Sequence, residues 1–253
     1  MEKGKKKFRR FSVFRIAEHW MVILTSLVLF ATGLSQRFWH LDSAQWFILK
    51  MGGVDNVRYV HRYAGLLFSI GLILHLTIAI GRVLRRRWSP SMMIGREDFR
   101  DAVHNMRYYF GLENHPARCG RYDYMEKFEY WTILVGGVLM TATGAVLWLP
   151  TIFTLILPGE AIPAAKALHS NEALVIFLIN AIWHIYNSIF SPEVFPLDTS
   201  IFTGYISRER MIREHPLELA AIEGVDPDDL LKNGKKEAAP SKSIPAPAPG
   251  VKG

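Results

Sequence analysis

Apolar residues gather into four long runs along this chain, separated by polar and charged segments. The runs cover approximately residues 16–38, 57–84, 128–150 and 164–190. Each exceeds the roughly 20 residues that a helix needs to cross about 30 Å of hydrocarbon. Because backbone polar groups in lipid must be satisfied within the chain, such runs favour helices. The pattern therefore predicts an all-α integral membrane protein, a four-helix transmembrane bundle.

The distribution of basic residues predicts the orientation of this bundle. Seven Lys and Arg occur in the first fifteen residues, ten in segment 82–127 and eight after residue 190. The connections 36–56 and 151–166 carry only three. Since Lys and Arg of short loops stay on the cytoplasmic side, we expect both termini and the middle loop inside, and the two short loops outside.

Two segments outside the apolar runs have patterns of their own. Within Arg96–Tyr109 and just after it, apolar residues recur at helical spacing beside charges, which predicts an amphipathic helix on the cytoplasmic membrane face. The end of the chain is rich in Lys, Ala and Pro, a composition typical of disorder. We therefore expect a four-span domain over residues 1–220 and a cytoplasmic tail over 221–253, disordered from about residue 230.

Composition restricts the chemistry that this chain can support alone. Half of its 253 residues are hydrophobic, and 30 Lys and Arg outnumber 23 Asp and Glu. A single cysteine excludes a disulfide framework, a Cys-based zinc site and an iron–sulfur cluster held by this chain alone. The absence of CxxCH argues against covalently attached haem, and no GxGxxG, P-loop or GxSxG motif occurs. No nucleic-acid partner is expected.

Five histidines lie within the apolar runs, where ionisable side chains are costly and usually mark function. They are His19, His61, His75, His169 and His184. A separation of 14 or 15 residues corresponds to about 21–22 Å along a helix and returns broadly to the same face. With the predicted orientation, His61 and His169 share an outer level, whereas the other three share an inner level.

Pairs of imidazoles from different helices are typical axial ligands of b-type haem. Zinc instead prefers three or four ligands in one tight cluster. The two levels therefore predict two haem b groups, which would form a transmembrane path for electrons. Spacing alone leaves open which two inner histidines form a pair. Another interpretation is a haem-free membrane anchor in which the histidines relay protons.

Several sequence segments, in order and spacing, resemble the cytochrome b (gamma) subunit of respiratory formate dehydrogenases, a family that also includes hydrogenase-associated cytochromes b. The resemblance covers roughly residues 8–220. Its segments are FRIAEHW, VRYVHRYAG, RYDYMEKFEYW, TATGAVLW, LHSNEAL, WHIYNSIF and GYISRERMIREHP.

The resemblance implies a ligand set for each of the two haems. It assigns the outer haem to His61 and His169, and the inner haem to His19 and His184. His75 has no expected counterpart in the formate enzymes. Together with His61 it resembles the His-x13-His pattern of the cytochrome b in quinol–cytochrome c complexes. His75 is therefore the alternative partner of His184, or a group that serves a quinone.

The resemblance also places a quinone near the inner haem, beside the polar segment that precedes the third span. The matching residues are Tyr122, Asp123, Glu126 and Lys127. Asp123 and Glu126 stand where the family has amides, so protonation is expected to be handled differently here. The alternative interpretation of this segment is a charged cap before the span.

Together these features predict a di-haem b-type cytochrome subunit of a respiratory oxidoreductase complex in the bacterial inner membrane, surrounded by lipid. It would transfer electrons between a partner on the periplasmic side, an iron–sulfur or cytochrome c subunit, and menaquinone or ubiquinone on the cytoplasmic side. Electrons could equally flow outward, from quinol to a periplasmic cytochrome c or reductase. The spacing predicts the electron path but not its direction.

Overall fold

Four long helices dominate the computed structural model, which describes residues 6–85, 91–191 and 194–238. They are α1 (Val13–Arg37), α3 (Val54–Leu84), α5 (Tyr124–Trp148) and α7 (Ala161–Ile185), and α7 continues into a π-helical turn, η1 (Tyr186–Phe190). Each of the four is long and apolar enough to cross a membrane. The predicted four-helix transmembrane bundle is confirmed.

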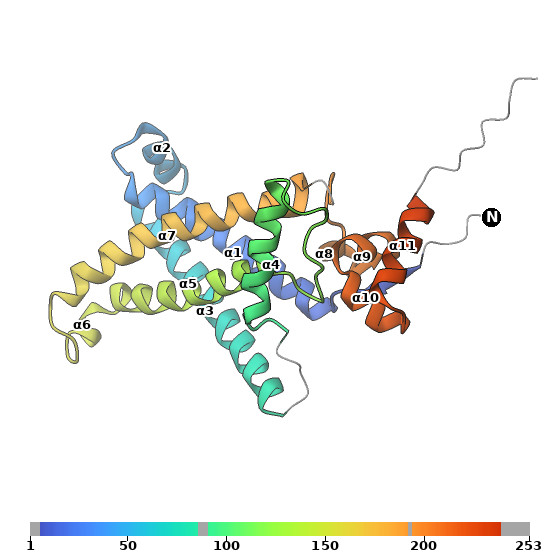
Figure 1. The fold of residues 1–253 in the computed structure, drawn as a ribbon. Coiled ribbons are helices and arrows are strands. Elements are labelled where there is room, and N and C mark those ends of the chain that lie inside the picture. The colour runs from blue at the N-terminus through green and yellow to red at the C-terminus, as the bar shows by residue number, and fades with distance from the viewer. Residues whose placement is uncertain (1–5, 86–90, 192–193, 239–253) are drawn as a thin grey trace, which may run out of the picture.

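Small residues bring the long helices close together. Helix α1 packs mainly against α3 and α5 against α7, while contacts of α3 with α5 and of α1 with α7 complete the bundle (Figure 1). A Cβ on Gly137 of α5 would lie only 3.1 Å from Cζ of Phe68 on α3. The rings of Phe30 and Phe177 stack with centroids 3.7 Å apart, joining α1 to α7. In lipid no hydrophobic effect drives helices together, so their association depends on close packing. A glycine such as Gly137 lets two helix backbones approach closely.

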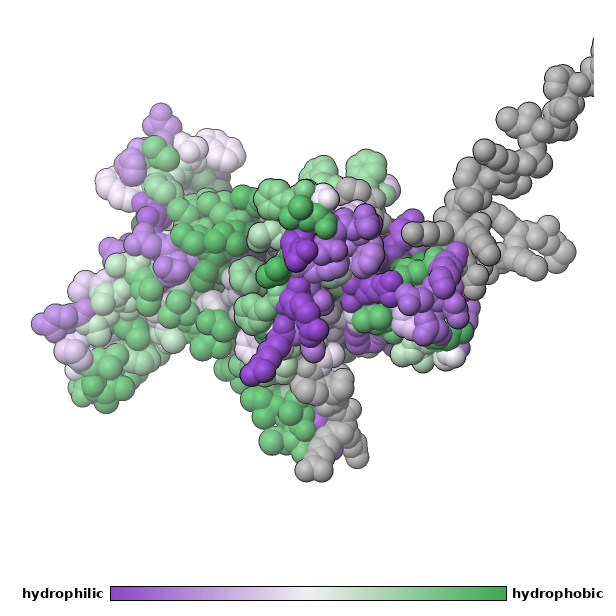
Figure 2. Space-filling view, in the orientation of Figure 1, coloured by the Kyte–Doolittle hydropathy of each residue, from purple (hydrophilic) through white to green (hydrophobic). Residues whose placement is uncertain are grey.

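The outward faces of the bundle are apolar and uncovered. Large aliphatic side chains on its surface include Leu24, Leu27, Ile70, Ile73 and Ile182, all more than half exposed. Figure 2 shows this apolar surface over the long helices and a polar surface over α4 and the C-terminal helices. Such a surface matches lipid hydrocarbon, as expected for a multi-pass membrane protein.

Helix α4 (Arg96–Tyr109) is the predicted amphipathic helix of the long loop. Its side chains Phe99, Val103 and Met106 are exposed, whereas Asp98 and Asn105 are buried against the protein. In Figure 1 it runs across the direction of α7. An apolar face turned away from the protein and a polar face turned towards it suit a helix that lies at the membrane interface.

The two ends of the bundle differ. One end carries only short connections with α2 (Asp42–Lys50) and α6 (Pro150–Phe153). At the other end, strand β1 (Lys7–Arg9) pairs antiparallel with β2 (Tyr205–Ser207). Around this pair lie α8 (Ser200–Thr203), α9 (Arg208–Glu214), α10 (Pro216–Glu223) and α11 (Pro227–Ala238). We call β1, β2 and α9–α11 the cap, which lies on the predicted cytoplasmic side.

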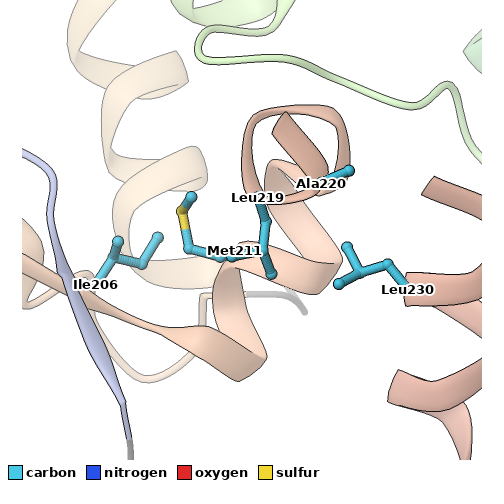
Figure 3. Close-up of a cluster of buried hydrophobic side chains, with 5 residues drawn as sticks. All are labelled: Ile206, Met211, Leu219, Ala220 and Leu230. Carbon is cyan, nitrogen blue, oxygen red and sulfur yellow. The ribbon is translucent and has the colours of Figure 1, made fainter. Parts of the chain in front are cut away.

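The cap has its own small hydrophobic core. Figure 3 shows its members, Ile206, Met211, Leu219, Ala220 and Leu230. The sequence predicted a tail from residue 221 with disorder from about residue 230, but the boundary falls within α10 and the chain stays helical to Ala238. The reason is that Leu230 is buried in this core and anchors α11. Residues 239–253, on which the rest of that prediction falls, lie outside the described residues.

Replacing Leu219 by Ala tests the core of the cap. Leu219 is fully buried, so Leu219→Ala should destabilise the cap by about 2–5 kcal/mol through lost burial and a cavity. The matched control is Leu217→Ala on the same helix, because Leu217 is 40% exposed and should cost about 0.5 kcal/mol or less. Hydrogen exchange of α9–α11 in detergent measures both, and equal effects of the two variants would contradict the assignment.

Candidate functional site

The two histidines predicted at the outer level face each other across the bundle. The ring centroids of His61 on α3 and His169 on α7 are 6.3 Å apart, with an interplanar angle of 77°. A metal–imidazole nitrogen bond measures about 2.0–2.1 Å, so two such bonds in line separate the ring centroids by roughly 6 Å. The spacing of this pair therefore suits two axial ligands of one iron.

A threonine of the neighbouring helix contacts each outer imidazole. Nδ1 of His61 lies 2.8 Å from Oγ1 of Thr32 on α1, and Nδ1 of His169 lies 2.9 Å from Oγ1 of Thr143 on α5. Metal-binding histidines usually engage their second nitrogen in this way, which orients the ring. Sequence reasoning missed both threonines, although the tripeptide Ala-Thr-Gly occurs at each site, at residues 31–33 and 142–144.

At the inner level His184 of α7 faces His19 of α1. Their ring centroids are 5.7 Å apart and the rings are tilted by 42°. Nδ1 of His184 lies 2.5 Å from a carboxylate oxygen of Glu129 on α5. Nδ1 of His19 is buried with no hydrogen-bond partner among the described residues. A buried ring nitrogen of this kind calls for a further group beside it.

His75, the alternative inner histidine, is engaged elsewhere. Its Nε2 lies 3.0 Å from the hydroxyl of Tyr130, and its Nδ1 lies 3.1 Å from Nη1 of Arg15 and 3.3 Å from Oε1 of Glu18. Both ring nitrogens therefore meet protein side chains. Of the two candidates for the partner of His184, His19 is the one whose ring faces it.

The residues at both levels fit a haem b. Each level offers two facing imidazoles from different helices, at the separation that one iron between them requires. At the outer level Gly33 and Gly144 lie against the two rings, since a Cβ at either position would come 3.4 or 3.3 Å from the histidine Cε1. Side chains there would restrict the imidazoles, so the glycines leave them room.

The four predicted quinone residues lie at the start of α5 and make contacts with other parts of the protein. Asp123 caps α5: the N–H of Glu126 donates to Asp123 at 2.6 Å, and the N–H of Asp123 donates to Glu126 at 3.0 Å. The guanidinium of Arg10 lies 3.1 Å from the Glu126 carboxylate and 5.1 Å from the ring centroid of Tyr122. The charged-cap interpretation accounts for these contacts, and a role towards quinone stays a prediction.

Lys127, the fourth of these residues, forms a buried ion pair. Its Nζ donates to both carboxylate oxygens of Asp98 on α4, at 2.7 and 3.0 Å. Both side chains are at least nine-tenths buried. The pair thus joins α4 to the start of α5. Removing either member would leave an uncompensated buried charge, which is costly.

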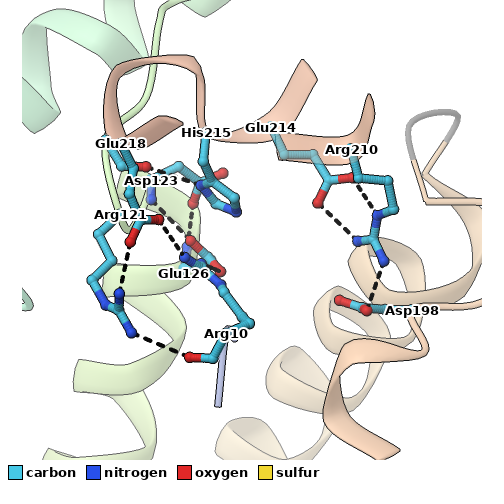
Figure 4. Close-up of polar contacts among 10 residues, drawn as sticks. Arg10, Arg121, Asp123, Glu126, Asp198, Arg210, Glu214, His215 and Glu218 are labelled. Atoms are coloured by element: carbon cyan, nitrogen blue, oxygen red, sulfur yellow. Dashed lines mark hydrogen bonds and ion pairs between the residues drawn. The ribbon is translucent and has the colours of Figure 1, made fainter. Parts of the chain in front are cut away.

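A polar cluster around Arg10 joins the cap to the start of α5 (Figure 4). Arg10 and Arg121 both donate to the carboxylate of Glu218, at 3.1 and 2.6 Å. His215 interacts through Nδ1 with the carbonyl of Gly120 at 3.0 Å. Burial, and then the positive charge of Arg10, lowers the pKa of His215 to about 3. His215 is therefore neutral at physiological pH and donates this hydrogen bond.

A second ion-pair group lies beside this cluster. Arg210 donates to Asp198 at 2.8 Å and to both oxygens of Glu214, at 2.7 and 2.8 Å. Burial raises the pKa of Asp198, but hydrogen bonds from Arg210 and Ser200 outweigh it and hold that pKa below its usual value. The group links the segment that follows η1 to α9, as Figure 4 shows.

Comparison with known proteins gives one family match and several distant relatives. A model of the prokaryotic cytochrome b561 family matches residues 10–203, a range that contains the four long helices and all five of their histidines. The cytochrome b556(fdo) subunit of formate dehydrogenase from Escherichia coli K12 is 22% identical over 201 residues, which cover 78% of this chain and 85% of that subunit.

Two further relatives have similar names. The nitrate-inducible formate dehydrogenase cytochrome b556(Fdn) subunit of Escherichia coli K12 is 23% identical over 224 residues, 88% of this chain and 94% of that subunit. The formate dehydrogenase cytochrome b556 subunit of Haemophilus influenzae is 25% identical over 168 residues, 66% of this chain and 65% of that subunit.

Variants of Asp98 and Lys127 test whether this pair stabilises the protein or instead contacts quinone. Asp98→Asn should destabilise the protein by about 3–5 kcal/mol because it leaves the Lys127 charge buried and unpaired. The double variant Asp98→Asn, Lys127→Gln should recover most of this loss. Thermal unfolding in detergent measures both, with Glu97→Gln, an exposed neighbour on α4, as the control. Additive losses in the double variant would contradict a structural pair.

Proposed function

Because this chain belongs to the prokaryotic cytochrome b561 family, we propose that it is the di-haem cytochrome b subunit of a formate dehydrogenase-type respiratory complex. Membership of a cytochrome b family implies haem b and a prokaryotic membrane location. The observation that carries the count of two haems is the pair of facing imidazoles at each of two levels.

In this proposal His61 and His169 hold the outer haem, and His19 and His184 hold the inner haem. The haems supply one-electron redox chemistry when bound. The chain orients the imidazoles between long, largely apolar helices. His169 and His184 are fifteen residues apart on α7, which corresponds to about 22 Å along the helix. The two sites would thus span much of the roughly 30 Å hydrocarbon layer.

The proposed complex places a redox partner at the outer end of the bundle, with an iron–sulfur or cytochrome c centre. Support comes from the names of the relatives, which are subunits of formate dehydrogenases. The helix α2 at this end exposes Trp46 and Leu49, with 62% and 76% of their surface accessible. Apolar side chains on a short outer connection suit contact with a partner subunit more than a substrate pocket.

Quinone would react at the cytoplasmic end, near the inner haem and the segment from Tyr122 to Lys127. We assign His75 to this chemistry and not to iron. Its contacts with Glu18 and Tyr130 connect α1, α3 and α5 at the inner level. Quinone reduction takes two electrons and two protons, and a histidine between a carboxylate and a phenol can hold and pass on a proton.

Haem analysis of histidine variants tests the ligand assignment. His61→Ala or His169→Ala should each remove the outer haem, and His19→Ala or His184→Ala the inner haem, so the haem-to-protein ratio should fall from two to one. Dithionite-reduced difference spectra and pyridine haemochromogen assays of the purified protein measure this ratio. His40→Ala is the control, because His40 is exposed outside the long helices. Absence of b-type bands in the wild type would defeat the proposal.

A separate variant tests the role of His75. His75→Gln should retain both haems and lower quinone-dependent turnover of the assembled complex by tenfold or more, since the amide cannot relay a proton. Haem content and turnover are measured on the same preparation. Loss of one haem in His75→Gln would instead make His75 an iron ligand in place of His19.

A further inference from the structure

The inner and outer imidazole levels differ in the group that Nδ1 meets. Both outer histidines contact a neutral threonine hydroxyl, whereas His184 at the inner level contacts the carboxylate of Glu129. The contrast lies in side chains of α1 and α5, the helices that pack against α3 and α7. This contrast gives two otherwise similar pairs of histidines different electrostatic surroundings.

The threonine contacts determine which outer ring nitrogen carries the proton. Oγ1 of Thr32 donates to the carbonyl of Val28 at 2.6 Å, and Oγ1 of Thr143 donates to that of Leu139 at 2.7 Å. A hydroxyl has one proton, so each threonine oxygen acts as an acceptor towards the imidazole. Nδ1–H of each histidine is then the donor, and Nε2 keeps its lone pair for a metal.

A twice-occurring tripeptide builds this arrangement. Ala31-Thr32-Gly33 lies on α1 beside His61, and Ala142-Thr143-Gly144 lies on α5 beside His169. In each copy the threonine contacts Nδ1 of the histidine and the glycine lies against its Cε1. The outer level thus has the same uncharged support on both sides.

The inner level has a charged support. Nδ1 of His184 is 2.5 Å from Oε1 of Glu129, whose side chain is only 15% exposed. A carboxylate acceptor makes an imidazole a more basic, more electron-donating ligand than a hydroxyl acceptor does. It also adds negative charge beside the site, which favours the oxidised metal. The nearby charges of Arg15 and Glu18 pair with each other at 2.9 Å and largely cancel.

Two cationic side chains lie near the outer histidines in place of a carboxylate. Arg62 follows His61 in the chain, and Arg37 of α1 donates to Asn171, two residues after His169, at 2.8 Å. Cations near a redox centre favour its reduced state. The carboxylate contact of His184 therefore lowers the reduction potential of the inner site relative to the outer one.

We propose that Glu129 and the two Ala-Thr-Gly tripeptides set the two haem sites to different reduction potentials, with the carboxylate-supported inner site the more negative. This inference rests on the proposed function, because it needs a haem at each level. Glu129, Thr32 and Thr143 are positioning residues that act through the histidines.

Redox titration of the full-length protein in detergent tests Glu129. Glu129→Gln keeps an oxygen acceptor but removes the charge, and should shift the inner midpoint potential to a more positive value with haem content unchanged. A tenfold change in the oxidised-to-reduced ratio at fixed ambient potential corresponds to about 59 mV for one electron. Glu129→Asp retains the charge and should remain near the wild type. The outer couple is the internal control in the same protein.

The wild type and single-haem variants identify the two couples. His61→Ala should leave only the more negative couple, which is assigned to the inner site without any change at Glu129. If the couple that remains is the more positive one, or if Glu129→Gln shifts neither couple or both equally, the inference is overturned. Absence of haem from the wild type would defeat the proposed function itself, so the two failures are distinguishable.

The threonines are tested by haem affinity at the outer site. Thr143→Val should weaken outer haem binding by about 10–100-fold, and Thr143→Ser should restore it because the hydroxyl returns. Thr141→Val is the matched control two residues away, since within the described part of the chain the Thr141 hydroxyl contacts Ser69 at 3.0 Å and no histidine. Equal haem retention in Thr143→Val and Thr141→Val would overturn the role of the tripeptide.

Discussion

An imidazole inside hydrocarbon carries ring nitrogens that need partners, and the two histidine levels of this structure depend on how that need is met. Water is not available there, so an unsatisfied polar group costs several kcal/mol. At the outer level a threonine of the adjacent helix satisfies Nδ1, which leaves Nε2 as the ring nitrogen that can bind a metal. The threonine contacts that make the outer histidines tolerable in the membrane are therefore the same contacts that would prepare them as ligands.

The cap serves the inner level through its strand pairing. Strand β1 immediately precedes α1, and β2 follows α7 and its π-helical turn, so their pairing joins the start of one helix to the end of the other. His19 lies near that start of α1 and His184 near that end of α7. A two-stranded ribbon is marginal alone, but the hydrophobic core of the cap supports it. The strand pair thereby restrains the region in which the two inner imidazoles meet.

The length of the apolar runs was sufficient to predict the four spans, because lipid requires long apolar helices whatever the tertiary packing. The ends were less well placed: the third span was expected from residue 128, but α5 begins at Tyr124. Asp123 and Glu126 form a capping box there, a signal that the sequence contains before the apolar run. The β1–β2 pairing could not be predicted, since three-residue strands distant in the chain leave no periodic pattern.

The sequence predicted the depths of the five histidines in the membrane, but not which of their rings face each other. Counting 1.5 Å per residue placed the five histidines at two levels, yet depth alone could not tell His19 from His75. In the structure the rings of His19 and His184 lie together, whereas His75 meets side chains of α1 and α5. The threonine partners were missed for a similar reason: a repeated Ala-Thr-Gly is visible in the sequence, but the helix that it faces is not.

Helix α7 contributes a histidine to each level, and its geometry explains how one helix can serve two different neighbours. His169 faces His61 on α3, while His184 faces His19 on α1. Fifteen steps of about 100° leave the two α7 side chains roughly 60° apart around the helix axis. Two histidines directly above one another would point at the same neighbour, so this offset is what lets one helix address both. The π-helical turn begins two residues after His184, at Tyr186, and rotates the following chain away from that register. The register of α7 thus sets which helices its two histidines approach.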